Sequence, residues 1–378
     1  MRLSSEALNR ATLARQLLLE REALPVVDAV RRVVALQAQE PASPYVALWN
    51  RLRDFDPGAL DAAFGSYDVV KAPLMRITLH AVTAEDHGSF RAAMRSTLRA
   101  ARLNDRRFRA TGLSADDADD LASHLATAVR RPLRRSEIES LIAEHRGAAP
   151  DAAVWWALRT VAPLVHAATG GPWSYGRTPA FVAPPHGREP DDQAAATQRL
   201  VLRYLAAFGP ASRRDVAQFA LLRQSEIEPA IDALADELVE LEGPVGETLY
   251  DVPGAPLPDG DVPAPPRLMA MWDSILLAYA DRSRVIPPAY RPFVIRRNGD
   301  VLPTVLVDGF VCGVWRHGEG GIEVTAFHAL DDAAWEGVEA EARALLELLD
   351  GRDEAVYGRF GHWWQRFEGE QVRVVGLG

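Results

Sequence analysis

The sequence predicts a mainly α-helical fold with small β-hairpins, an α+β fold in which winged-helix units follow one another. Three observations support this prediction. Groups of amphipathic helices end in a short β-hairpin, and this order occurs three times. A Pro- and Gly-rich linker at 253–266 separates these repeats from the rest of the chain. The rest, 267–378, carries hairpin signals and is predicted to be a small C-terminal α+β module.

The first unit is predicted to span residues 1–110. Apolar residues recur every three or four positions in several stretches, and an alternating β-branched stretch follows. We expect helices at 6–19, 25–37, 43–54 and 57–64, a hairpin at 69–82 and an arginine-rich helix at about 84–109. Pro41 disfavours helix at Glu40, and Ser43 can cap the next helix with Pro44 in its first turn.

The second and third units are predicted at 111–185 and 191–253, on either side of a Pro-rich linker. Helices are expected at 116–129, 134–145 and from 151 onward, and then at 191–207, 212–221 and 225–238. Hairpin strands are expected at 165–167 with 178–183, and at 239–242 with 248–252. The third unit is the clearest, because helix–turn–helix followed by a two-stranded wing is the winged-helix pattern. Pro132–Ile138 and Pro210–Val216 also resemble each other.

The C-terminal module combines a hairpin with an acidic helix. Asp308-Gly309 lies in the middle of an apolar stretch that ends at Trp315, and Asp-Gly suits a type I′ turn. The stretch 331–349 has helical periodicity and an acidic surface.

Composition excludes several classes of protein. The chain has 378 residues, 48% hydrophobic and 25% charged, which is typical of a globular protein of several domains. Cys312 is the only cysteine, which excludes a disulfide framework and any Cys-rich zinc or iron–sulfur site. No metal and no cofactor are expected. Lys71 is the only lysine, and no phosphate-binding loop contains it. Without a signal peptide or an apolar run of membrane-spanning length, the expected location is cytoplasmic with no membrane partner.

Charge is distributed unevenly along the chain. The net charge is −10, which argues against a polyanionic partner unless basic residues gather locally. Arginines do gather at 91–109 and at 130–135, whereas acidic residues gather at 331–354. Either these arginines contact a polyanion, or they form solvated helix faces with i, i+4 ion pairs.

Gln37-Ala38-Gln39 is the polar feature that stands out. The pair follows an apolar run that is expected to be helical, and a break at Glu40-Pro41 comes directly after it. At a frayed helix end both side chains could converge on one point and offer two carbonyl acceptors and two donors without charge. The alternative is a pair of solvated glutamines at a helix terminus.

Four blocks together resemble a known family. They are Gln37–Gln39, Met75–His80, Trp272–Tyr279 with Asp281–Val285, and the Asp308-Gly309 hairpin that ends at Trp315. In this order the chain resembles the bacterial winged-helix DNA glycosylases of the AlkZ and YcaQ type along nearly its whole length. The resemblance implies a C-shaped array whose concave basic face holds double-stranded DNA.

The resemblance also implies a catalytic role for Gln37 and Gln39, because the AlkZ branch carries Gln-apolar-Gln where the YcaQ branch carries Gln-apolar-Asp. AlkZ-like proteins often protect producers of DNA-alkylating antibiotics by removing bulky adducts, and some unhook interstrand crosslinks. The expected activity is therefore base excision of alkylation damage by a monomer.

Chemistry restricts the expected substrate. A purine alkylated at N7 of guanine or N3 of adenine is already cationic, so its departure needs no general acid. A glutamine carbonyl could then orient the attacking water near an oxocarbenium-like sugar. Because Lys71 is expected on a wing strand away from the glutamines, we expect a monofunctional glycosylase.

Six other residues are candidates for binding DNA or the lesion. They are Ser43, Arg76, His80, Arg282, Arg284 and Trp315. The arginines could hold phosphates or form surface ion pairs, the histidine could approach the lesion or lie in the core, and the tryptophan could stack on a base or pack internally. The competing interpretation of the whole chain is a non-enzymatic winged-helix regulator or a damage-binding protein. Three tandem units with a glutamine pair favour the enzyme, since regulators of this fold are usually dimers with one reading helix per subunit.

Overall fold

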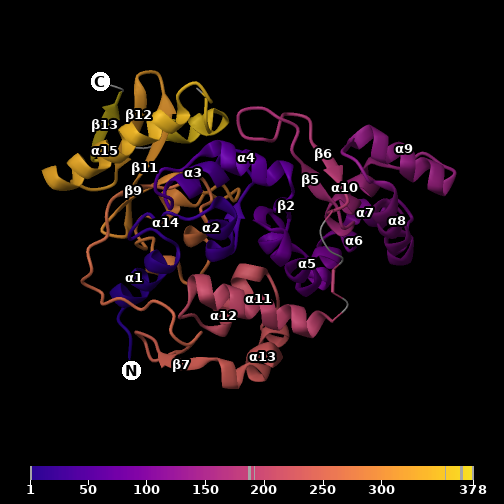
Figure 1. Ribbon diagram of the computed structural model, residues 1–378, viewed down its shortest axis with the longest axis horizontal. Helices are drawn as coiled ribbons and strands as arrows, with labels where there is room; N and C mark the ends of the chain where they lie inside the picture. The colour runs from indigo at the N-terminus through magenta and orange to yellow at the C-terminus, as the bar shows by residue number, and fades with distance from the viewer. Residues whose placement is uncertain (1, 186–188, 191, 354, 367–368, 377–378) are drawn as a thin grey trace.

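Figure 1 shows a computed structural model of the chain, which describes residues 2–185, 189–190, 192–353, 355–366 and 369–376. Three groups of helices each carry a small antiparallel sheet, and an α+β module follows them. The predicted fold class is therefore confirmed. The first unit lies at the centre of Figure 1, with the second unit to its right, the third below it and the C-terminal module at the upper left.

The first unit is built from three helices and a three-stranded sheet. Its elements are α2 (Val26–Val33), α3 (Ser43–Trp49), α4 (Pro57–Gly65), β1 (Leu36–Gln37), β2 (Val69–Pro73) and β3 (Leu79–Thr83). The strands are antiparallel in the order β1-β3-β2. A single 3₁₀ turn, η1 (Met75–Ile77), forms the loop of the β2–β3 hairpin. This hairpin corresponds to the one expected at 69–82.

The helix expected at 25–37 is wrong beyond Val33. Val34 has a left-handed φ of 72°, and this ends α2. The chain then enters β1, where Gln37 pairs with His80 of β3. Apolar and β-branched residues take strand geometry readily when a partner strand is available. Sequence periodicity did not reveal this, because the partner strand lies more than forty residues further along the chain.

The second unit repeats the same arrangement. Its elements are α8 (Ala115–Ala128), β4 (Leu133–Arg134), α9 (Arg135–Arg146), α10 (Ala152–Val161), β5 (Val165–Ala167) and β6 (Ala180–Val182). It has its own apolar core, formed by residues such as Phe108, Ile138 and Trp155. The sheets of the first two units join where Lys71 of β2 pairs with His166 of β5. The six strands run in the order β1-β3-β2-β5-β6-β4.

The arginine-rich helix expected at 84–109 is three helices. They are α5 (Ala84–Ala93), α6 (Arg95–Leu103) and α7 (Arg106–Arg109); α5 packs against α11, and α6 and α7 pack against α10. Arg91 is buried and donates from Nη1 to the carbonyl of Thr160 at 3.1 Å. Arg102 donates to Thr160 Oγ1 at 3.1 Å and lies 4.7 Å above the Trp156 ring. Part of this arginine-rich segment therefore binds the protein itself.

The third unit has a separate wing. Its elements are α11 (Gln193–Phe208), α12 (Arg213–Ala220), α13 (Gln224–Ala233), η2 (Ala235–Glu237), β7 (Val239–Glu242) and β8 (Thr248–Asp251). The N-terminal helix α1 (Ser5–Arg15) packs on α11 rather than inside the first unit. Arg15 and Asp251 form a buried ion pair at 2.6 Å that connects α1 to β8.

The C-terminal module is a five-stranded antiparallel sheet covered by a long helix. Its strands are β9 (Arg267–Leu268), β10 (Thr304–Val307), β11 (Phe310–Gly318), β12 (Gly321–Ala326) and β13 (Gln371–Val375), in the order β13-β12-β11-β10-β9. Its helices are α14 (Arg291–Val294), α15 (Asp332–Leu349), and the 3₁₀ segments η3 (Ser274–Leu276), η4 (Arg282–Arg284) and η5 (Gly358–Arg366). Asp308 and Gly309 have φ values of 46° and 80°, so the predicted type I′ turn is confirmed. A Cβ on Gly309 would lie 2.5 Å from Asn9 Oδ1, so this turn also requires glycine for space.

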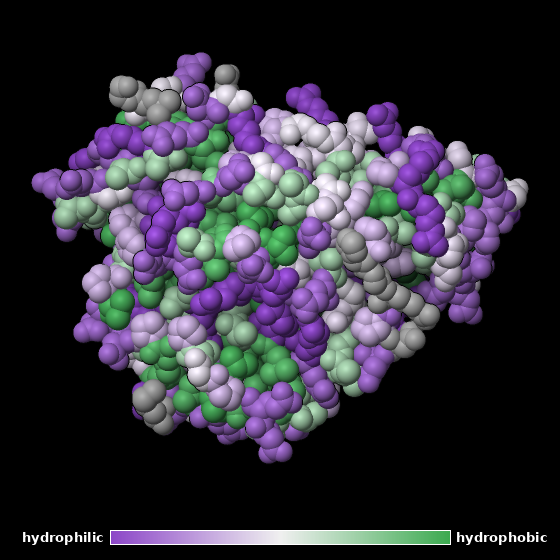
Figure 2. Space-filling model, viewed as in Figure 1, coloured by the Kyte–Doolittle hydropathy of each residue, from purple (hydrophilic) through white to green (hydrophobic). Residues whose placement is uncertain are grey.

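The surface shows no extended apolar face in the view of Figure 2, where apolar residues form separate patches among hydrophilic ones. The large apolar side chains that are exposed come from several parts of the chain, and two of them lie on β13: Leu221, Val239, Val245, Phe293, Val372 and Val374. Within the described ranges, no helix has the length and apolar character needed to cross a bilayer.

Candidate functional site

Gln37 is the last residue of β1, at the edge of the first sheet, and Gln39 lies in the bend that follows. The pair is therefore presented by the end of a strand and not by a frayed helix. Gln37 is only 3% exposed, whereas Gln39 is exposed. The carbonyl of Leu79 in β3 accepts the backbone N–H of Ala38 at 2.8 Å and holds the segment against the sheet.

The two amides have different surroundings. Gln37 Oε1 accepts the backbone N–H of Gln39 at 2.6 Å, so its carbonyl braces the turn that follows. Gln39 Oε1 lies 3.5 Å from the backbone N of Leu79, at the limit of a hydrogen bond. The buried glutamine therefore holds the exposed one, and the Gln39 amide is the one that can meet a solvent-borne group.

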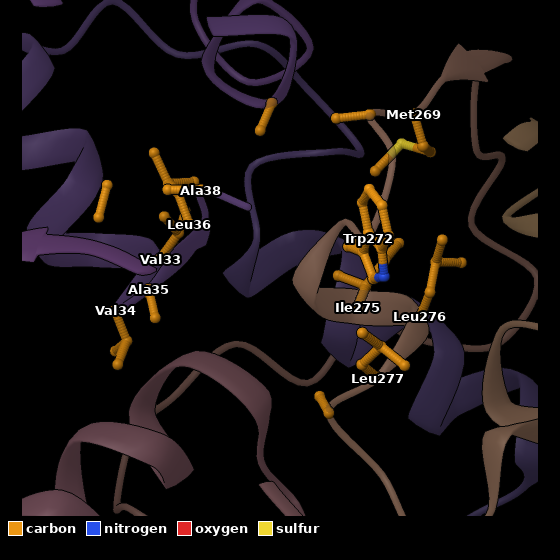
Figure 3. Close-up of a cluster of buried hydrophobic side chains, with 14 of the residues drawn as sticks. Val33, Val34, Ala35, Leu36, Ala38, Met269, Trp272, Ile275, Leu276 and Leu277 are labelled. Atoms are coloured by element: carbon orange, nitrogen blue, oxygen red, sulfur yellow. The ribbon is translucent and has the colours of Figure 1, made fainter. Parts of the chain in front are cut away.

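The C-terminal module supports this segment from beneath. Ser274 Oγ donates to the carbonyl of Ala35 at 2.8 Å. The Asp273 carboxylate accepts hydrogen bonds from Nη1 and Nη2 of Arg51, both at 2.9 Å, and both side chains are 1% exposed. Figure 3 shows the apolar part of the same region, a buried cluster to which the first unit and the C-terminal module both contribute. The labelled side chains are Val33, Val34, Ala35, Leu36, Ala38, Met269, Trp272, Ile275, Leu276 and Leu277. Asp273 and Ser274 belong to the Trp272–Tyr279 block of the sequence, which did not indicate a role for either residue.

His80 lies directly opposite Gln37 and is fully buried. Its Nδ1 donates to the carbonyl of Thr78 at 3.0 Å, and its Nε2 accepts from Arg76 Nη2 at 3.3 Å. Burial, followed by the charge of Arg76, lowers the pKa of His80 to about 3. The ring is therefore neutral at physiological pH, and its role is that of an acceptor for Arg76.

Arg76 lies in a strained turn beside the glutamine segment. Arg76 and Ile77 have φ values of 55° and 59°, which side chains with a Cβ rarely adopt, least of all a β-branched one. The guanidinium lies 5.5 Å from the centre of the Phe219 ring in α12 and donates to the Phe219 carbonyl at 3.3 Å. Burial, followed by the charge of Arg282, lowers the pKa of Arg76 to about 10, so it stays cationic at neutral pH.

Arg282 is the second cation at this place. Burial and the nearby Arg291 lower its pKa, and its Nε is buried without a hydrogen-bond partner. Among the described residues, neither Arg76 nor Arg282 forms an ion pair with a carboxylate. Two adjacent arginines without a counter-ion are suited to bind an anion such as a phosphate.

Three other candidates are engaged inside the protein. Trp315 is 0% exposed and donates from Nε1 to the carbonyl of Met269 at 2.9 Å, so the expectation that it stacks on a base is wrong for this conformation. Arg284 donates to the carbonyl of Pro210 at 2.9 Å and lies 4.1 Å above the Tyr279 ring, which makes it a structural cation.

Ser43 does not cap α3, whose N-cap is Ala42. Its buried hydroxyl lies 3.0 Å from the Tyr357 hydroxyl and connects α3 to the C-terminal module. The expected cap is therefore wrong. No side chain caps α3. Pro44 reduces the need for a cap, because it lacks one of the N–H groups that a cap would satisfy.

Lys71 points away from the glutamines. Ala72 is paired with His80, which is paired with Gln37, so these three side chains share one face of the sheet. Lys71 precedes Ala72 and therefore lies on the opposite face. Its side chain is 4% exposed, and burial lowers its pKa to about 8.

The described part of the chain contains no group of three His, Cys, Asp or Glu side chains arranged to hold a metal ion. The side chains described above for this site are two amides, two arginines and a neutral histidine.

Comparison with known families identifies the protein. A family model described as "DNA glycosylase AlkZ-like" matches residues 30–348, which include the glutamine segment, the β2–β3 hairpin and most of the C-terminal module. The chain belongs to the AlkZ-like DNA glycosylase family. It is thus a DNA glycosylase, and the resemblance noted from four sequence blocks is confirmed.

Relatives of the AlkZ-like family agree in sequence and in fold. The chain is 25% identical over 349 residues to the "Interstrand DNA cross-link repair glycosylase" of Streptomyces sahachiroi, covering 87% of this chain and 92% of that protein. The solved structure titled "Streptomyces sahachiroi DNA glycosylase AlkZ" superposes with a TM-score of 0.77 at 22% identity, covering 92% of this chain and 97% of that one. This second match shows a shared fold across nearly the whole molecule.

Proposed function

We propose that this AlkZ-like protein hydrolyses the N-glycosidic bond of cationic alkylated purines in double-stranded DNA, such as N7-alkylguanine and N3-alkyladenine. The observation that carries the proposal is the exposed Gln39 amide, which is braced by the buried Gln37. In this role Gln39 positions the attacking water and Gln37 holds the turn that presents it.

The neutral site matches a cationic substrate. A positively charged base departs as a neutral purine, so no acid has to protonate it. His80, which pairs with Gln37 across the strands, is neutral and buried and has no acidic proton to give. What remains for the enzyme is to orient the water, and such orientation can contribute up to about 7–11 kcal/mol for well-aligned reactants. Uncharged bases should therefore be poor substrates.

Arg76 and Arg282 are proposed to bind a phosphate next to the lesion. They are adjacent and cationic, and neither has a carboxylate partner among the described residues. Arg76 lies beside His80, which pairs with Gln37, so a phosphate bound there would bring the reacting sugar toward Gln39. Trp315 is left out of this proposal because it is fully buried, and Arg284 because its bond to the Pro210 carbonyl, at 2.9 Å, is shorter than the two 3.3 Å internal bonds of Arg76.

A monofunctional mechanism follows from the position of Lys71. A lyase step would need its amine to attack C1′ of the abasic sugar, and the amine lies on the opposite face of the sheet from Gln37. We expect an intact abasic site as the product. Trapping of a covalent protein–DNA adduct by borohydride through Lys71 would contradict this.

The decisive experiment uses a duplex with a single 7-methylguanine. We expect release of free 7-methylguanine by the wild-type protein, and loss of release in the Gln37→Ala/Gln39→Ala double variant. Gln224→Ala, at an exposed glutamine of α13, is the matched control and should keep the wild-type rate. Binding of the damaged duplex without release of base would favour a non-cleaving damage-binding protein instead.

We extend the proposal to bulky adducts and interstrand crosslinks, because the named relative is a crosslink repair glycosylase. Gel analysis of a duplex crosslinked through two N7-alkylguanines would show unhooking as separation of the strands. The protein is proposed to act as a monomer, in keeping with the separate apolar patches seen in Figure 2. Light scattering of the free protein tests this.

A further inference from the structure

Glu40 directly follows the exposed glutamine, in the bend that leads from β1 toward α3. Its side chain is 14% exposed and forms an ion pair with Arg359 of η5 in the C-terminal module. The carbonyl of Glu40 accepts the backbone N–H of Ser43 at 3.1 Å, which starts the turn into α3. The side chain and the backbone carbonyl of Glu40 are thus both held by other parts of the protein.

Lys71 lies on the face of the sheet opposite the Gln37 side chain. Its amine is 4.3 Å from the centre of the Tyr175 ring, and no described carboxylate forms an ion pair with it. Burial raises the pKa of Glu40 and lowers that of Lys71 to about 8, and the charge of each residue partly offsets the shift in the other. Glu40 is therefore the charged group that acts on the only lysine of the chain.

A buried lysine without a hydrogen-bonded carboxylate destabilises a fold. Its place on the face opposite Gln37 calls for a reason. We propose that Glu40 is a positioning residue, held by its ion pair with Arg359 and attracted by the charge of Lys71, and that this arrangement fixes the turn that presents Gln39 to the substrate. The inference rests on the proposed function of Gln39.

The groups around this cluster determine how it responds to pH. Glu40 faces Arg359 from η5, Lys71 from β2 and Asp300 from the loop before β10. Lys71 also faces His166 of β5 and Tyr175 of the β5–β6 loop. Burial lowers the pKa of His166 to about 3 and raises that of Tyr175, so both are neutral near pH 8. Lys71 is then the member of the cluster that titrates in this range.

The test compares two exposed arginines of the C-terminal module. Arg359→Gln removes the cation that holds Glu40, and Arg359→Lys keeps it; the side chain is 64% exposed, so neither should disturb folding. Arg343→Gln is the matched control, since Arg343 is 52% exposed and pairs with Glu339 of α15. We expect Arg359→Gln and Glu40→Gln to lower the single-turnover rate by about 10- to 100-fold, as small misplacements of reacting groups do, without weakening DNA binding.

Arg359→Lys should restore most of the rate, and Arg343→Gln should match wild type. Equal rates for Arg359→Gln, Glu40→Gln and wild type would overturn the inference. So would a loss of rate that is fully explained by weaker DNA binding.

A pH series supplies a second readout. The ratio of the wild-type rate to the Lys71→Met rate should be constant below about pH 7 and fall toward one as Lys71 loses its proton; using a ratio cancels any titration of the lesion itself. A ratio that is flat across this range would overturn the role of Lys71. The Gln39→Ala variant separates the two proposals. If Gln39→Ala is inactive while Glu40→Gln is fully active, only the inference about Glu40 fails. If Gln39→Ala is fully active, the proposed function fails as well.

Discussion

The junction between the first strand and the second helix differs between the first unit and the other two. In the second unit β4 leads straight into α9, and Glu137 accepts the backbone N–H of Arg134 at 2.9 Å. In the third unit Ser212 caps α12, and Asp215 accepts the Ser212 N–H at 2.9 Å in a capping box. In the first unit, five residues, 38–42, separate β1 from α3, and no side chain caps the helix.

This difference separates two kinds of junction. In a structural junction side chains only cap the helix, whereas in a chemical junction a polar group is left exposed and can act on a substrate. A capping box satisfies its backbone donors within four residues and leaves no polar group free. The first unit instead satisfies the Gln39 N–H with the Gln37 side chain, and the adjoining amide stays exposed. Pro41 disfavours helix at Glu40, and the chain bends there instead. The proposed chemistry thus lies where the repeat departs from its own pattern.

The largest expected effect is on the glutamine pair. Alanine at both Gln37 and Gln39 should reduce the single-turnover rate by at least about 10²- to 10⁴-fold, the range for loss of a positioned base or hydrogen-bonding group. DNA binding should change little, since neither side chain is charged. Gln39→Asp should retain more activity than Gln39→Ala, because a carboxylate can also orient water. If the double variant released 7-methylguanine at the wild-type rate, the junction of the first unit would have no catalytic role.

A second prediction concerns the buried charge that accompanies this junction. The pKa of Lys71 falls from 10.5 to about 8 on folding. Below pH 8 both states carry the proton, so Lys71→Met should stabilise the protein by about 3 kcal/mol at pH 7. Above pH 8 the folded protein releases the proton first, and the gain should vanish toward pH 10.5. Chemical denaturation at a series of pH values measures this. A gain that is independent of pH would show that the methionine acts by packing alone.

A third prediction compares arginines of the site with arginines of the second unit. DNA binding should weaken with salt, with a log–log slope of about −0.9 for each neutralised phosphate. Replacing Arg76 or Arg282 with glutamine should make the slope less negative by about 0.9 in each case. Arg134→Gln, at the capped junction of the second unit, decides whether that unit also contacts DNA. An unchanged slope in the first two variants would mean that this arginine pair does not meet a phosphate.

The smallest effect is expected at the capped junction of the third unit. Ser212→Ala removes the side chain that accepts the Asp215 N–H and should cost about 1 kcal/mol of unfolding free energy. The rate of base release should stay unchanged, because this junction carries no chemistry. Thermal unfolding and single-turnover assays on the same preparation test both parts. A loss of activity without loss of stability would contradict the division between structural and chemical junctions.

Local signals in the sequence were sufficient for much of the fold. The order of helices and hairpins, the Asp308-Gly309 turn and the break at Pro41 depend on residues a few positions apart, and each was predicted. The resemblance that picked out Gln37 and Gln39 also rested on short blocks whose order along the chain is visible without a structure.

Tertiary structure decided what these residues can do. Helical periodicity placed Gln37 in a helix, whereas pairing with His80 puts it in a strand. An aromatic near a hairpin suggested stacking by Trp315, whereas the Met269 carbonyl and complete burial make it part of the core. Sequence alone also left Ser274 and Glu40 without roles.

The reason is the distance along the chain between the partners. Ser274 reaches Ala35 across 239 positions, and Arg359 reaches Glu40 across 319. Periodicity, capping and turn chemistry report only on neighbours within about one or two helical turns, whereas burial and ion pairing depend on which distant segment packs alongside. For this protein the sequence by itself determined the elements and the glutamine motif, and the packing of the C-terminal module against the first unit decided which side chains are free to act.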